Sequence, residues 1–503
     1  MPSNSAKVKV RAVESYGAQI VFCEPTQEAR EAACAEVIAK TGAILIHSFE
    51  NEYVMAGQGT AAVELLQDIP DIDVVICPVG GGGLLCGTAA AAKSIRPEIK
   101  VIAAEPLNPI GWLTLTSVLY VQGRSSEAAE AVETAHRLEA ETGIDIESFI
   151  SLAVVRSDAG RFDEARKIFE ANLAEKPSSS AHIAYAFDLL RLGLFRDGWQ
   201  HYEFRLMQPN RLSDRLRYGK PPWTGQSLQG RTVLLRREQG FGDVIQFVRY
   251  APMLKALGAT VWLQVGAAMN GLAKRFDGVD RVFTDGDALP DFDFYVHLPS
   301  LPRLFGTELQ TIPSNVPYLR PSDEHLAKWK KRLGETSTFK VGLVWAGHPN
   351  HLRDWERSIP LKALMPLAGV EGVRLFSLQK GDASAELASV SDLAVEDLSP
   401  DLSDFSDTAA AIQCLDLIIS VDTAVAHLAG ALARPVWLLL PKVGDFRWLE
   451  SRTDSSWYPT MRLFRQERRG EWGDVVVRVS EALKTVAEGP GELMQRPHQS
   501  PMA

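Results

Sequence analysis

The chain has 503 residues, of which 46% are apolar and 23% charged, ordinary values for globular protein. At about 150 residues per domain, this length predicts roughly three domains. The composition disfavours collagen-like, wholly disordered and supercharged chains, and the net charge of -10 argues against a protein built around nucleic-acid phosphate. No apolar run is long enough for a membrane helix and the first residues have no apolar signal core, so we expect a cytoplasmic protein without a membrane span.

Tryptophan and cysteine are distributed unevenly along the chain. All of the tryptophans lie at or after Trp112, whereas every cysteine except Cys414 precedes it. A single evolutionary unit rarely divides in this way, so we predict a boundary near residue 110. The cysteines form neither CxxC pairs nor the dense pattern of a secreted protein, which predicts reduced thiols and neither disulfides nor metal ligands.

Residues 1–108 alternate between helical and strand patterns, which predicts an α/β arrangement. The expected elements are, in chain order, helix 7–17, strand 18–23, helix 26–42, strand 43–49, helix 56–69, strand 71–79 and helix 84–95. A loop of four glycines, Gly80, Gly81, Gly82 and Gly83, joins the last strand to the last helix. The N–H groups of such a loop, together with the helix dipole, can surround a phosphate, and a simple tight turn is the alternative.

Four motifs stand in a characteristic order in this segment. They are KVKVRAVESYGA at 7–18, GQGT at 57–60, PVGGGGL at 78–84 and AEP at 104–106. With these motifs the segment resembles the serine/threonine dehydratase and serine racemase family of pyridoxal-phosphate enzymes. The resemblance implies a partial pyridoxal-phosphate-enzyme α/β fold, in which the four glycines would hold the cofactor phosphate.

Parts of that family's catalytic apparatus have no counterpart in this sequence. By the resemblance, the Schiff-base lysine belongs to a motif upstream of Met1, and the residue facing the pyridine nitrogen belongs to a region beyond the matching segment. The family's metal site pairs the Glu of the EP motif, here Glu105, with an Asp six residues later, where this chain has Gly111. Without the lysine no imine can form, so we expect residues 1–108 to be a truncated, inactive fragment with a vestigial phosphate loop.

Residues 109–220 are expected to be all-α and to contain an internal repeat. In each unit a glycine is followed five residues later by a small residue: Gly123 and Ala128, Gly160 and Ala165, Gly193 and Gly198. Successive glycines are separated by 37 and 33 residues, which bracket the 34-residue period of tetratricopeptide repeats. Repeats of this kind present a concave surface to peptides or partner proteins, and spacing the neighbouring domains apart is the alternative use.

The rest of the chain shows two series of alternating strand and helix patterns. Strands are expected at 232–236, 260–265 and 281–284, with a helix over 243–258, and then at 339–347, 373–379, 415–421 and 434–441. This order implies parallel sheets with right-handed crossovers. Two Rossmann-like halves, 221–325 and 326–488, predict a two-lobed enzyme with its site between the lobes, and the polar tail 489–503 is expected to be disordered.

Polar residues gather at two of these strand ends. Gly240-Phe241-Gly242-Asp243 places two flexible glycines before a carboxylate at the start of a helix, where an ordinary N-cap is the alternative. Asp422 follows a strand, and Thr423 and His427 lie four residues apart on one helical face. That helix N-terminus could receive a diphosphate, and the alternative is a second ordinary cap with a packed histidine.

A third polar cluster runs from Gly347 to Arg357 and is followed at the next strand end by Gln379 and Lys380. Arginine and lysine converging at one point could neutralise phosphate. The alternative for each cation is an exposed position with no specific partner.

These clusters belong to a longer series of motifs: EQGFGDVIQFVRY, VGLVWAGHPNH, ERSIPL, SLQKG, DFSDTAAAI, VDTAVAHLAGAL and SSWYPTMRLFRQ. With them, the chain from about Pro222 to Leu483 resembles the heptosyltransferase-like glycosyltransferases, particularly bacterial proteins that carry tetratricopeptide repeats ahead of such a domain. The resemblance implies a GT-B fold, with the acceptor on the lobe 221–325 and the nucleotide sugar on the lobe 326–488.

The resemblance also implies roles for single residues. Asp243 matches the catalytic aspartate of the GD motif and would be the general base on an acceptor hydroxyl, with Gly240 and Gly242 shaping its loop. Arg357 matches the basic residue of a (K/R)x(W/I)P motif and would contact the leaving diphosphate. The donor-binding residues expected in this way are Arg357, Gln379, Lys380, Asp422, Thr423 and His427.

We therefore expect an inverting hexosyl- or heptosyltransferase that uses a nucleotide-sugar donor and a protein or glycan acceptor, with the repeats assisting acceptor recruitment. Such an enzyme needs no metal and no cofactor, because a helix dipole and cations stabilise the leaving group, so the DxD strings at 285–287 and 291–293 are interpreted as loop acids. Pyridoxal phosphate would matter only if residues 1–108 were functional. The alternatives are a non-catalytic repeat scaffold and, third, a pyridoxal-phosphate-dependent threonine/serine dehydratase.

Overall fold

The computed structural model forms two compact units, Met1–Val155 and Arg156–Ala503, which are described separately. It describes residues 1–503 apart from 4, 6, 47–50, 80–81, 104–107, 209–218, 335–337, 352, 391–393 and 490–503. The tail expected to be disordered thus lies, from residue 490 on, outside the described residues. Within the described part of the chain, no helix combines the length and the apolar character that crossing a membrane requires.

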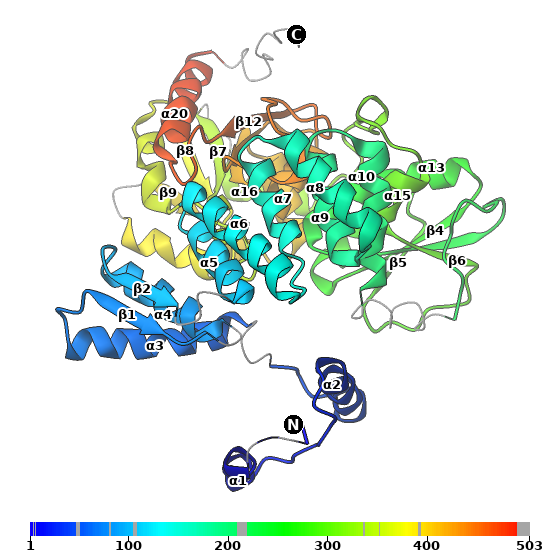
Figure 1. Ribbon diagram of the computed structural model, residues 1–503. Helices are drawn as coiled ribbons and strands as arrows, with labels where there is room; N and C mark the ends of the chain where they lie inside the picture. The colour runs from blue at the N-terminus through cyan, green and yellow to red at the C-terminus, as the bar shows by residue number, and fades with distance from the viewer. Residues whose placement is uncertain are drawn as a thin grey trace. The chain divides into compact units, whose positions relative to one another are not determined.

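The first unit contains a small parallel α/β layer (Figure 1). Its elements up to residue 103 are α1 (Lys7–Ser15), α2 (Gln27–Thr41), α3 (Glu52–Asp68), β1 (Val74–Cys77), α4 (Gly83–Ile95) and β2 (Lys100–Ala103). Strand β1 pairs with β2 in parallel. Helices α3 and α4 approach closely through glycines, since a Cβ added at Gly59 would lie 2.8 Å from the carbonyl oxygen of Gly87. The helices expected over 7–17, 26–42, 56–69 and 84–95 are confirmed.

Two of the strands expected in this unit do not form in its described residues. Residues 18–23 contain only an isolated bridge between Cys23 and Pro2, and residues 43–46 are irregular, while 47–49 lie outside the described residues. A strand is stabilised by pairing with a neighbour, and the apolar side chains here have little contact with anything: Phe22 is 54% and Ile44 90% exposed. The prediction of strands at 18–23 and 43–46 was therefore wrong.

Successive helices follow from residue 109 to residue 207. They are α5 (Pro109–Val121), α6 (Ser125–Thr142), α7 (Ser148–Asp158), α8 (Phe162–Glu175), α9 (Ser179–Arg191), α10 (Phe195–Tyr202) and η1 (Glu203–Met207). The boundary between the two units falls within α7. The all-α character expected of this region is thus seen in its described residues.

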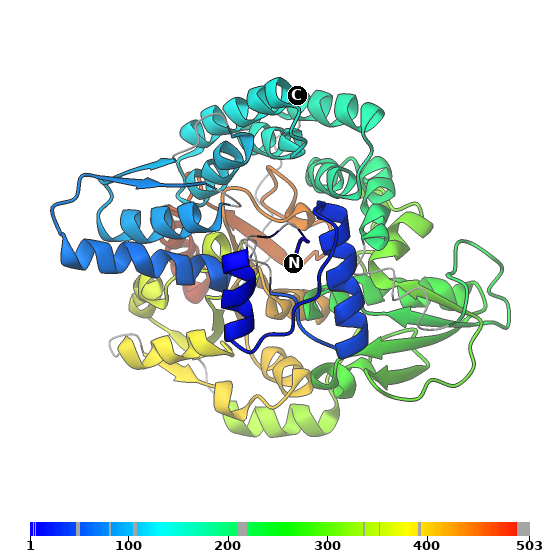
Figure 2. The ribbon, with the colours of Figure 1, turned by 60° about the horizontal axis from the view of Figure 1, so that its bottom comes forward.

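The glycine and small-residue pairs of the predicted repeat occupy equivalent points in three successive helix pairs. Each turn places its glycine at positive φ, +73° at Gly123, +79° at Gly160 and +80° at Gly193, a conformation that glycine adopts without strain. The small residues five positions later are buried, with Ala128 and Ala165 both 0% exposed. Figure 2 shows α9 and α10 side by side in the second unit. The assignment to tetratricopeptide repeats stays a prediction.

Gly198 is the small residue of the third pair, and it lets α10 approach α9. A Cβ added there would lie 2.7 Å from both Cγ and Cδ2 of Leu190 and 3.2 Å from its backbone nitrogen. We expect Gly198→Val to lower the free energy of unfolding by about 1–3 kcal/mol, because the two helices must separate to admit the side chain. Chemical denaturation of the variant measures this. Gly473→Val is the matched control, since no atom lies within 4 Å of the Cβ position at Gly473, and equal losses in the two variants would contradict the packing argument.

The second unit contains a four-stranded parallel sheet in the order β5-β4-β3-β6. Its strands are β3 (Thr232–Arg236), β4 (Thr260–Val265), β5 (Arg281–Thr284) and β6 (Phe294–His297). The other elements of this part are α12 (Phe241–Phe247), η2 (Val248–Tyr250), α13 (Ala251–Ala256), η3 (Ala267–Met269), α14 (Asn270–Ala273), η4 (Leu298–Ser300), α15 (Leu301–Leu304) and η5 (Leu309–Thr311). The strand order reverses at β3, which β4 and β6 flank, so the residues after β3 lie at a point where α/β sheets bind ligands.

A six-stranded parallel sheet follows, in the order β12-β11-β10-β7-β8-β9. Its strands are β7 (Phe339–Val344), β8 (Val373–Ser377), β9 (Val395–Asp397), β10 (Leu417–Val421), β11 (Val436–Leu440) and β12 (Met461–Arg465). The helices of this part are α16 (Asp323–Leu333), α17 (Asp354–Arg357), η6 (Leu361–Gly369), η7 (Asp382–Ser389), η8 (Ser399–Asp401), α18 (Phe405–Gln413), α19 (Ala424–Ala431), η9 (Phe446–Trp448) and α20 (Gly473–Glu488). Here the order reverses between β7 and β10, so the segments after these two strands meet.

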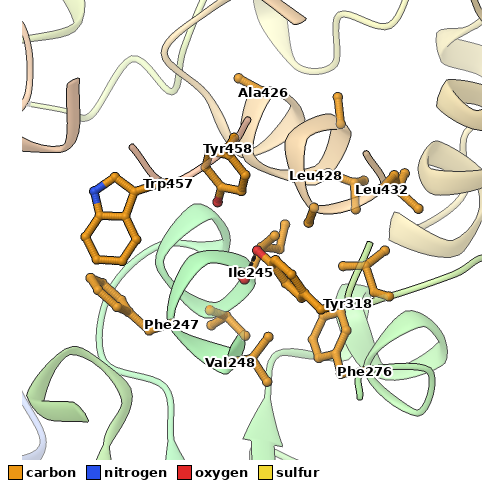
Figure 3. Packing of buried hydrophobic residues seen from close by; sticks show 14 of the residues in the cluster. Ile245, Phe247, Val248, Phe276, Tyr318, Ala426, Leu428, Leu432, Trp457 and Tyr458 are labelled. Atoms are coloured by element: carbon orange, nitrogen blue, oxygen red, sulfur yellow. Dashed lines mark hydrogen bonds between the residues drawn. The ribbon is translucent and has the colours of Figure 1, made fainter. Parts of the chain in front are cut away.

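The two sheets are joined through α12 and α19, which pack against each other. Figure 3 shows Ile245, Phe247 and Val248 of α12 and η2 in one buried cluster with residues of α19 and with Trp457 and Tyr458. The hydroxyl of Tyr318 donates to the carbonyl of Ile245 over 2.8 Å. The packing of α12 against α19 in this cluster fixes the distance between the segment after β3 and the segment after β10.

Buried Arg249 ties the two parts together with polar contacts beside that cluster. Its guanidinium donates to the carbonyl of Trp457 over 2.6 Å and to the hydroxyl of Tyr318 over 3.0 Å. It also lies over the rings of Tyr318 and Tyr458, at 4.9 and 4.6 Å from their centroids. Segments that are more than two hundred residues apart in the sequence are therefore held in one place.

Candidate active site

Asp243 lies in the first turn of α12, the helix that follows β3. The strand order of the four-stranded sheet reverses at β3. Gly240 is the N-cap of this helix, with extended backbone angles (φ -69°, ψ 173°) and no side chain to cap it. The Asp243 side chain is only 16% exposed, and it forms an ion pair with the guanidinium of Arg447. The predicted base is therefore a nearly buried carboxylate with a cationic partner.

Asp422, Thr423 and His427 lie at the end of β10 and the start of α19, as predicted. Thr423 is the N-cap of α19, and its hydroxyl is 3.1 Å from that of Ser420. His427 is buried, and its Nδ1 lies 2.9 Å from the hydroxyl of Tyr458. Its Nε2 lies 3.9 Å from a carboxylate oxygen of Asp422.

These two segments contact each other at Gly242. A Cβ added to Gly242 would lie 2.9 Å from Cδ2 and 3.5 Å from Nε2 of His427, and 3.7 Å from Cα of Ala424. Only a glycine lets the helix of Asp243 approach the N-terminal turn of α19 so closely. The structure thus brings together Asp243 from one sheet and Asp422, Thr423 and His427 from the other.

Arg357 joins this group from the end of α17. Its Nη1 donates to the backbone carbonyl of Asp422 over 3.1 Å, and its Nε donates to Asp354 over 2.8 Å. Gly347 packs against the same guanidinium, since its Cβ position is already taken by Arg357 and Asp354. The predicted donor cation therefore lies beside the predicted DTxxxH segment.

Gln379 and Lys380 lie at the end of β8 and are used by the backbone. The Gln379 oxygen accepts from the N–H groups of Trp345 and Ala346 over 3.1 and 3.0 Å, and its nitrogen donates to the carbonyls of Ala346 and Lys380 over 3.1 and 2.9 Å. The Lys380 ammonium donates to the carbonyls of Ser399 and Leu402. In this structure both side chains hold the strand ends in position, and their donor-binding role stays a prediction.

Arg447 and Asp445 belong to the same polar cluster and were not predicted from the sequence. Arg447 lies in η9, and Nη1 donates to the Asp445 carboxylate over 2.8 Å while other nitrogens contact Asp243 and the side-chain oxygen of Gln246. Asp445 also caps η9 by accepting from the Arg447 N–H over 3.0 Å. The motif KVGDFRWLE has no periodic pattern, and the proximity of its Asp and Arg to Asp243 is a tertiary contact that only the folded chain shows.

Burial and neighbouring charges shift the pKa values of the titratable groups in this cluster. Burial and the nearby Asp445 carboxylate raise the pKa of Asp422 to about 6, although the indole of Trp448 and the guanidinium groups of Arg357 and Arg447 oppose the shift. Burial also raises the pKa of Asp243, against the effect of Arg447. Burial, Arg447 and Arg249 lower the pKa of His427 well below its ordinary value, so this imidazole is neutral near pH 7.

Asp422 should make the stability of the second unit depend on pH. Folding raises the pKa of Asp422 from 3.8 to about 6. The stability that the protonated carboxyl contributes is therefore fully present below pH 3.8 and is lost as the pH rises through about 6. We expect Asp422→Asn, which cannot ionise, to raise the free energy of unfolding at pH 7.5 by about 3 kcal/mol and to have no effect below about pH 4. Denaturant unfolding at both pH values tests this. Asp291→Asn on an exposed loop is the control, and a difference for Asp422→Asn that stays constant with pH would contradict the expectation.

The DxD acids have basic or backbone partners of their own. Asp285 pairs with Arg237 and Asp291 with Lys220, while Asp293 accepts from Arg231 and Asp287 accepts from the backbone of Thr284. Across the residues that the structure describes, no group of three or more His, Cys, Asp or Glu side chains is arranged to hold a metal ion.

The glycine loop of the first unit is described in part. Gly80 and Gly81, like Glu105, lie outside the described residues. Gly82 has φ +86° and is the N-cap of α4, and its Cβ position lies 2.6 Å from the hydroxyl of Thr114 in α5. Gly83 is buried at the start of α4.

The lysines whose side chains are described in this unit do not fit a pyridoxal-phosphate site. Lys40 pairs with Glu36, and Lys93 donates to the carbonyl of Pro97 near the far end of α4. Lys100 pairs in register with Val74, at the opposite end of the two strands from the glycine loop. No imine-forming amine among them lies near the loop, so no step through this cofactor is assigned to the described residues.

Two family models match the chain. The model for pyridoxal-phosphate dependent enzymes matches residues 1–200. The model for glycosyltransferase family 9 (heptosyltransferase) matches residues 363–439, which include the segment from Gln379 to His427. Asp243 and Arg357 lie before that range.

Curated relatives match either most of the chain or about a fifth of it. Protein FlbA of Caulobacter vibrioides is 28% identical over 429 residues, which are 79% of this chain and 70% of that protein. Serine racemase of Dictyostelium discoideum is 49% identical over 107 residues, 21% of this chain and 33% of the enzyme, and the human enzyme is 44% identical over 108 residues, 22% and 32%. The chain therefore spans about a third of the length of the serine racemases that it matches.

Solved structures give the same pair of likenesses. A glycosyl transferase family 9 protein from Veillonella parvula is 11% identical and covers 53% of this chain and 98% of its own, with a TM-score of 0.40. Maize serine racemase is 40% identical and covers 23% of this chain and 35% of its own, with a TM-score of 0.22. By the family models, the chain resembles pyridoxal-phosphate dependent enzymes over residues 1–200 and glycosyltransferase family 9 (heptosyltransferase) proteins over residues 363–439.

Proposed function

We propose that this protein is an inverting glycosyltransferase of GT-B architecture that moves a sugar from a nucleotide-sugar donor to a glycan or protein acceptor. One observation carries the proposal: α12 and α19 pack together so that Gly242, the neighbour of Asp243, lies against His427 and Ala424 at the start of α19. A single displacement needs a base on one side of the anomeric carbon and a site for the leaving diphosphate on the other. The family 9 segment supports a glycosyltransferase, and this juxtaposition supports its mechanism.

In the proposed reaction Asp243 accepts the proton of an acceptor hydroxyl while that oxygen attacks the anomeric carbon and the nucleoside diphosphate leaves. In this proposal the N–H groups at the start of α19 would face the leaving diphosphate, and Arg357, which donates to the carbonyl of Asp422, would supply a cation beside them. Neutral His427 and Thr423 would hydrogen-bond sugar or phosphate oxygens. The bond to the leaving oxygen breaks as the new glycosidic bond forms, which inverts the anomeric centre.

The test uses the full chain and a panel of labelled nucleotide-diphosphate hexoses and heptoses. We expect at least one donor to bind and to be hydrolysed slowly to the inverted sugar, whose anomeric configuration NMR spectroscopy reports. Hydrolysis by water needs no knowledge of the acceptor. Absence of both binding and hydrolysis across the panel would refute the transferase and leave a repeat scaffold as the surviving interpretation.

We further propose that the repeats recruit the acceptor through a groove between α8, α9 and α10. This groove has a volume of ≈ 500 Å³ and is lined by apolar side chains, among them Leu173, Leu189 and Leu194, and by polar ones, among them Arg166 and His201. A lining of apolar and polar side chains suits an extended peptide segment. The side chain of Leu194 is 42% exposed there.

A charge at Leu194 tests this role for the groove. We expect Leu194→Glu to raise the KM for a protein acceptor roughly tenfold, because a buried charge opposes docking, and to leave donor hydrolysis unchanged. Leu257→Glu, on a leucine that is 47% exposed in another part of the second unit, is the matched control. Equal KM values for the wild type and Leu194→Glu would exclude the groove as the acceptor site.

A further inference from the structure

We propose that Arg447 is the positioning residue for the base Asp243, holding its carboxylate ionised and correctly oriented from the opposite sheet. This inference rests on the proposed function, because it names the residue that keeps Asp243 able to act as a base. Arg447 lies in η9, after β11 of the six-stranded sheet, whereas Asp243 lies after β3 of the four-stranded sheet.

The first support is the set of contacts that Arg447 makes. Its guanidinium contacts the carboxylates of Asp243 and Asp445 and the side-chain oxygen of Gln246, one partner for each of its three nitrogens. Asp243 and Gln246 belong to α12, three residues apart on one face. A planar fork that engages two residues of the same helix turn fixes the rotation of that helix as well as the carboxylate.

The second support is the rigidity of Arg447 itself. The side chain is 9% exposed, and its guanidinium carbon lies 4.4 Å from the ring centroid of Phe446 and 5.7 Å from that of Phe247. The carboxylate of Asp445 holds both the backbone and the side chain of Arg447. The cation is thus oriented before any substrate binds.

The third support is Gln246, whose side chain is 0% exposed. Its oxygen is used by Arg447, while its Nε2 is buried without a hydrogen-bond partner in the described structure. A buried amide that leaves one donor unsatisfied and presents its oxygen to Arg447 serves the orientation of that guanidinium.

The fourth support is the chemistry that a buried base requires. A carboxylate removed from water takes up a proton unless a cation compensates it, and a protonated carboxyl cannot accept the acceptor's proton. The charged and titratable groups that face Asp243 are Arg447 and Asp445 from the η9 segment, Tyr202 from α10, and His427 across Gly242 from α19. His427 is neutral and Tyr202 is buried, so among these groups Arg447 supplies the positive charge.

The experiment measures kcat for donor hydrolysis against pH in Arg447→Gln, Arg447→Lys and Asp445→Asn. We expect Arg447→Gln to move the acidic limb of the profile upward by at least about one pH unit, because the opposite charge that keeps Asp243 ionised is gone. Arg447→Lys keeps the charge and should retain the wild-type limb with a lower plateau. Asp445→Asn removes a competing carboxylate and should move the limb downward, which keeps the inference testable if Arg447→Gln does not fold.

Arg452→Gln is the matched control, since Arg452 pairs only with Asp454 among the ion pairs of the described residues. Its profile should coincide with that of the wild type. An Arg447→Gln or Asp445→Asn variant that lowers kcat equally at every pH, with the limb unmoved, would overturn the inference and leave the transferase intact. Failure of the proposed function is recognised separately, because then the wild type itself hydrolyses no donor.

Discussion

Asp243→Asn should reduce sugar transfer and donor hydrolysis by about 10³-fold while donor binding stays within a few-fold of the wild type. The asparagine oxygen can still accept from Arg447, so the contact that joins η9 to α12 is kept as a hydrogen bond from the guanidinium to a neutral acceptor. What disappears is a group able to take the proton of the attacking hydroxyl. Single-turnover kinetics for transfer and calorimetry for donor binding measure the two quantities independently.

The control for this variant is Asp291→Asn, an acid-to-amide change on a side chain that is 88% exposed and paired with Lys220. It should leave both quantities unchanged. If Asp243→Asn retained more than about a tenth of the wild-type kcat, Asp243 would not be the base, since general-base catalysis is worth at least 10²-fold.

Most strands of the second unit were predictable because they are short, largely apolar runs in parallel sheets. The runs at 232–236, 260–265 and 281–284 became β3, β4 and β5 with the expected bounds. β9, with only Val395–Asp397 and a half-buried pattern at the edge of its sheet, carries too little of that signal to be recognised. The helix expected over 243–258 forms in pieces, because Pro252 has no N–H to bond the carbonyl of Val248.

The same reasoning failed in the first unit for a physical reason. Residues 18–23 and 43–46 have strand-like composition, but strand formation depends on a neighbour, and sequence composition does not report whether a neighbour is present. β1 and β2 succeed because they pair with each other and are covered on one face by α3 and α4. On the other face Ile76 remains 65% exposed.

Some residues of the candidate site could be predicted from local sequence patterns, whereas others are recognised only by their tertiary contacts. Asp243 and Asp422 were predictable because each follows a strand and precedes a helix, a local pattern. Arg447 lies in a segment without periodicity, and its importance comes from a contact with a residue about two hundred positions earlier. Gln379 has the right location, but the backbone groups that occupy its amide become visible only in the folded chain.

Gly242→Ala should lower kcat by about 10²-fold, because it increases the distance between α12, which carries Asp243, and α19, which carries His427. The added methyl group would lie 2.9 Å from Cδ2 of His427, closer than such atoms approach in folded proteins. The imidazole cannot turn away freely, since it is buried, hydrogen-bonded to Tyr458 and packed beside Trp448 at 5.3 Å between ring centroids. α12 must therefore shift, and a displacement of about 1 Å in a catalytic group can cost 10²-fold in rate.

Gly473→Ala tests whether such a loss is specific, since its Cβ position has no atom within 4 Å and it lies at the start of α20. Measured kcat should be unchanged in that control, and thermal unfolding should show that Gly242→Ala remains folded. A Gly242→Ala protein with kcat within twofold of the wild type would mean that the close packing of α12 against α19 is not required for the reaction. The juxtaposition of Asp243 with His427 would then have to be replaced by a different arrangement of the two sheets during catalysis.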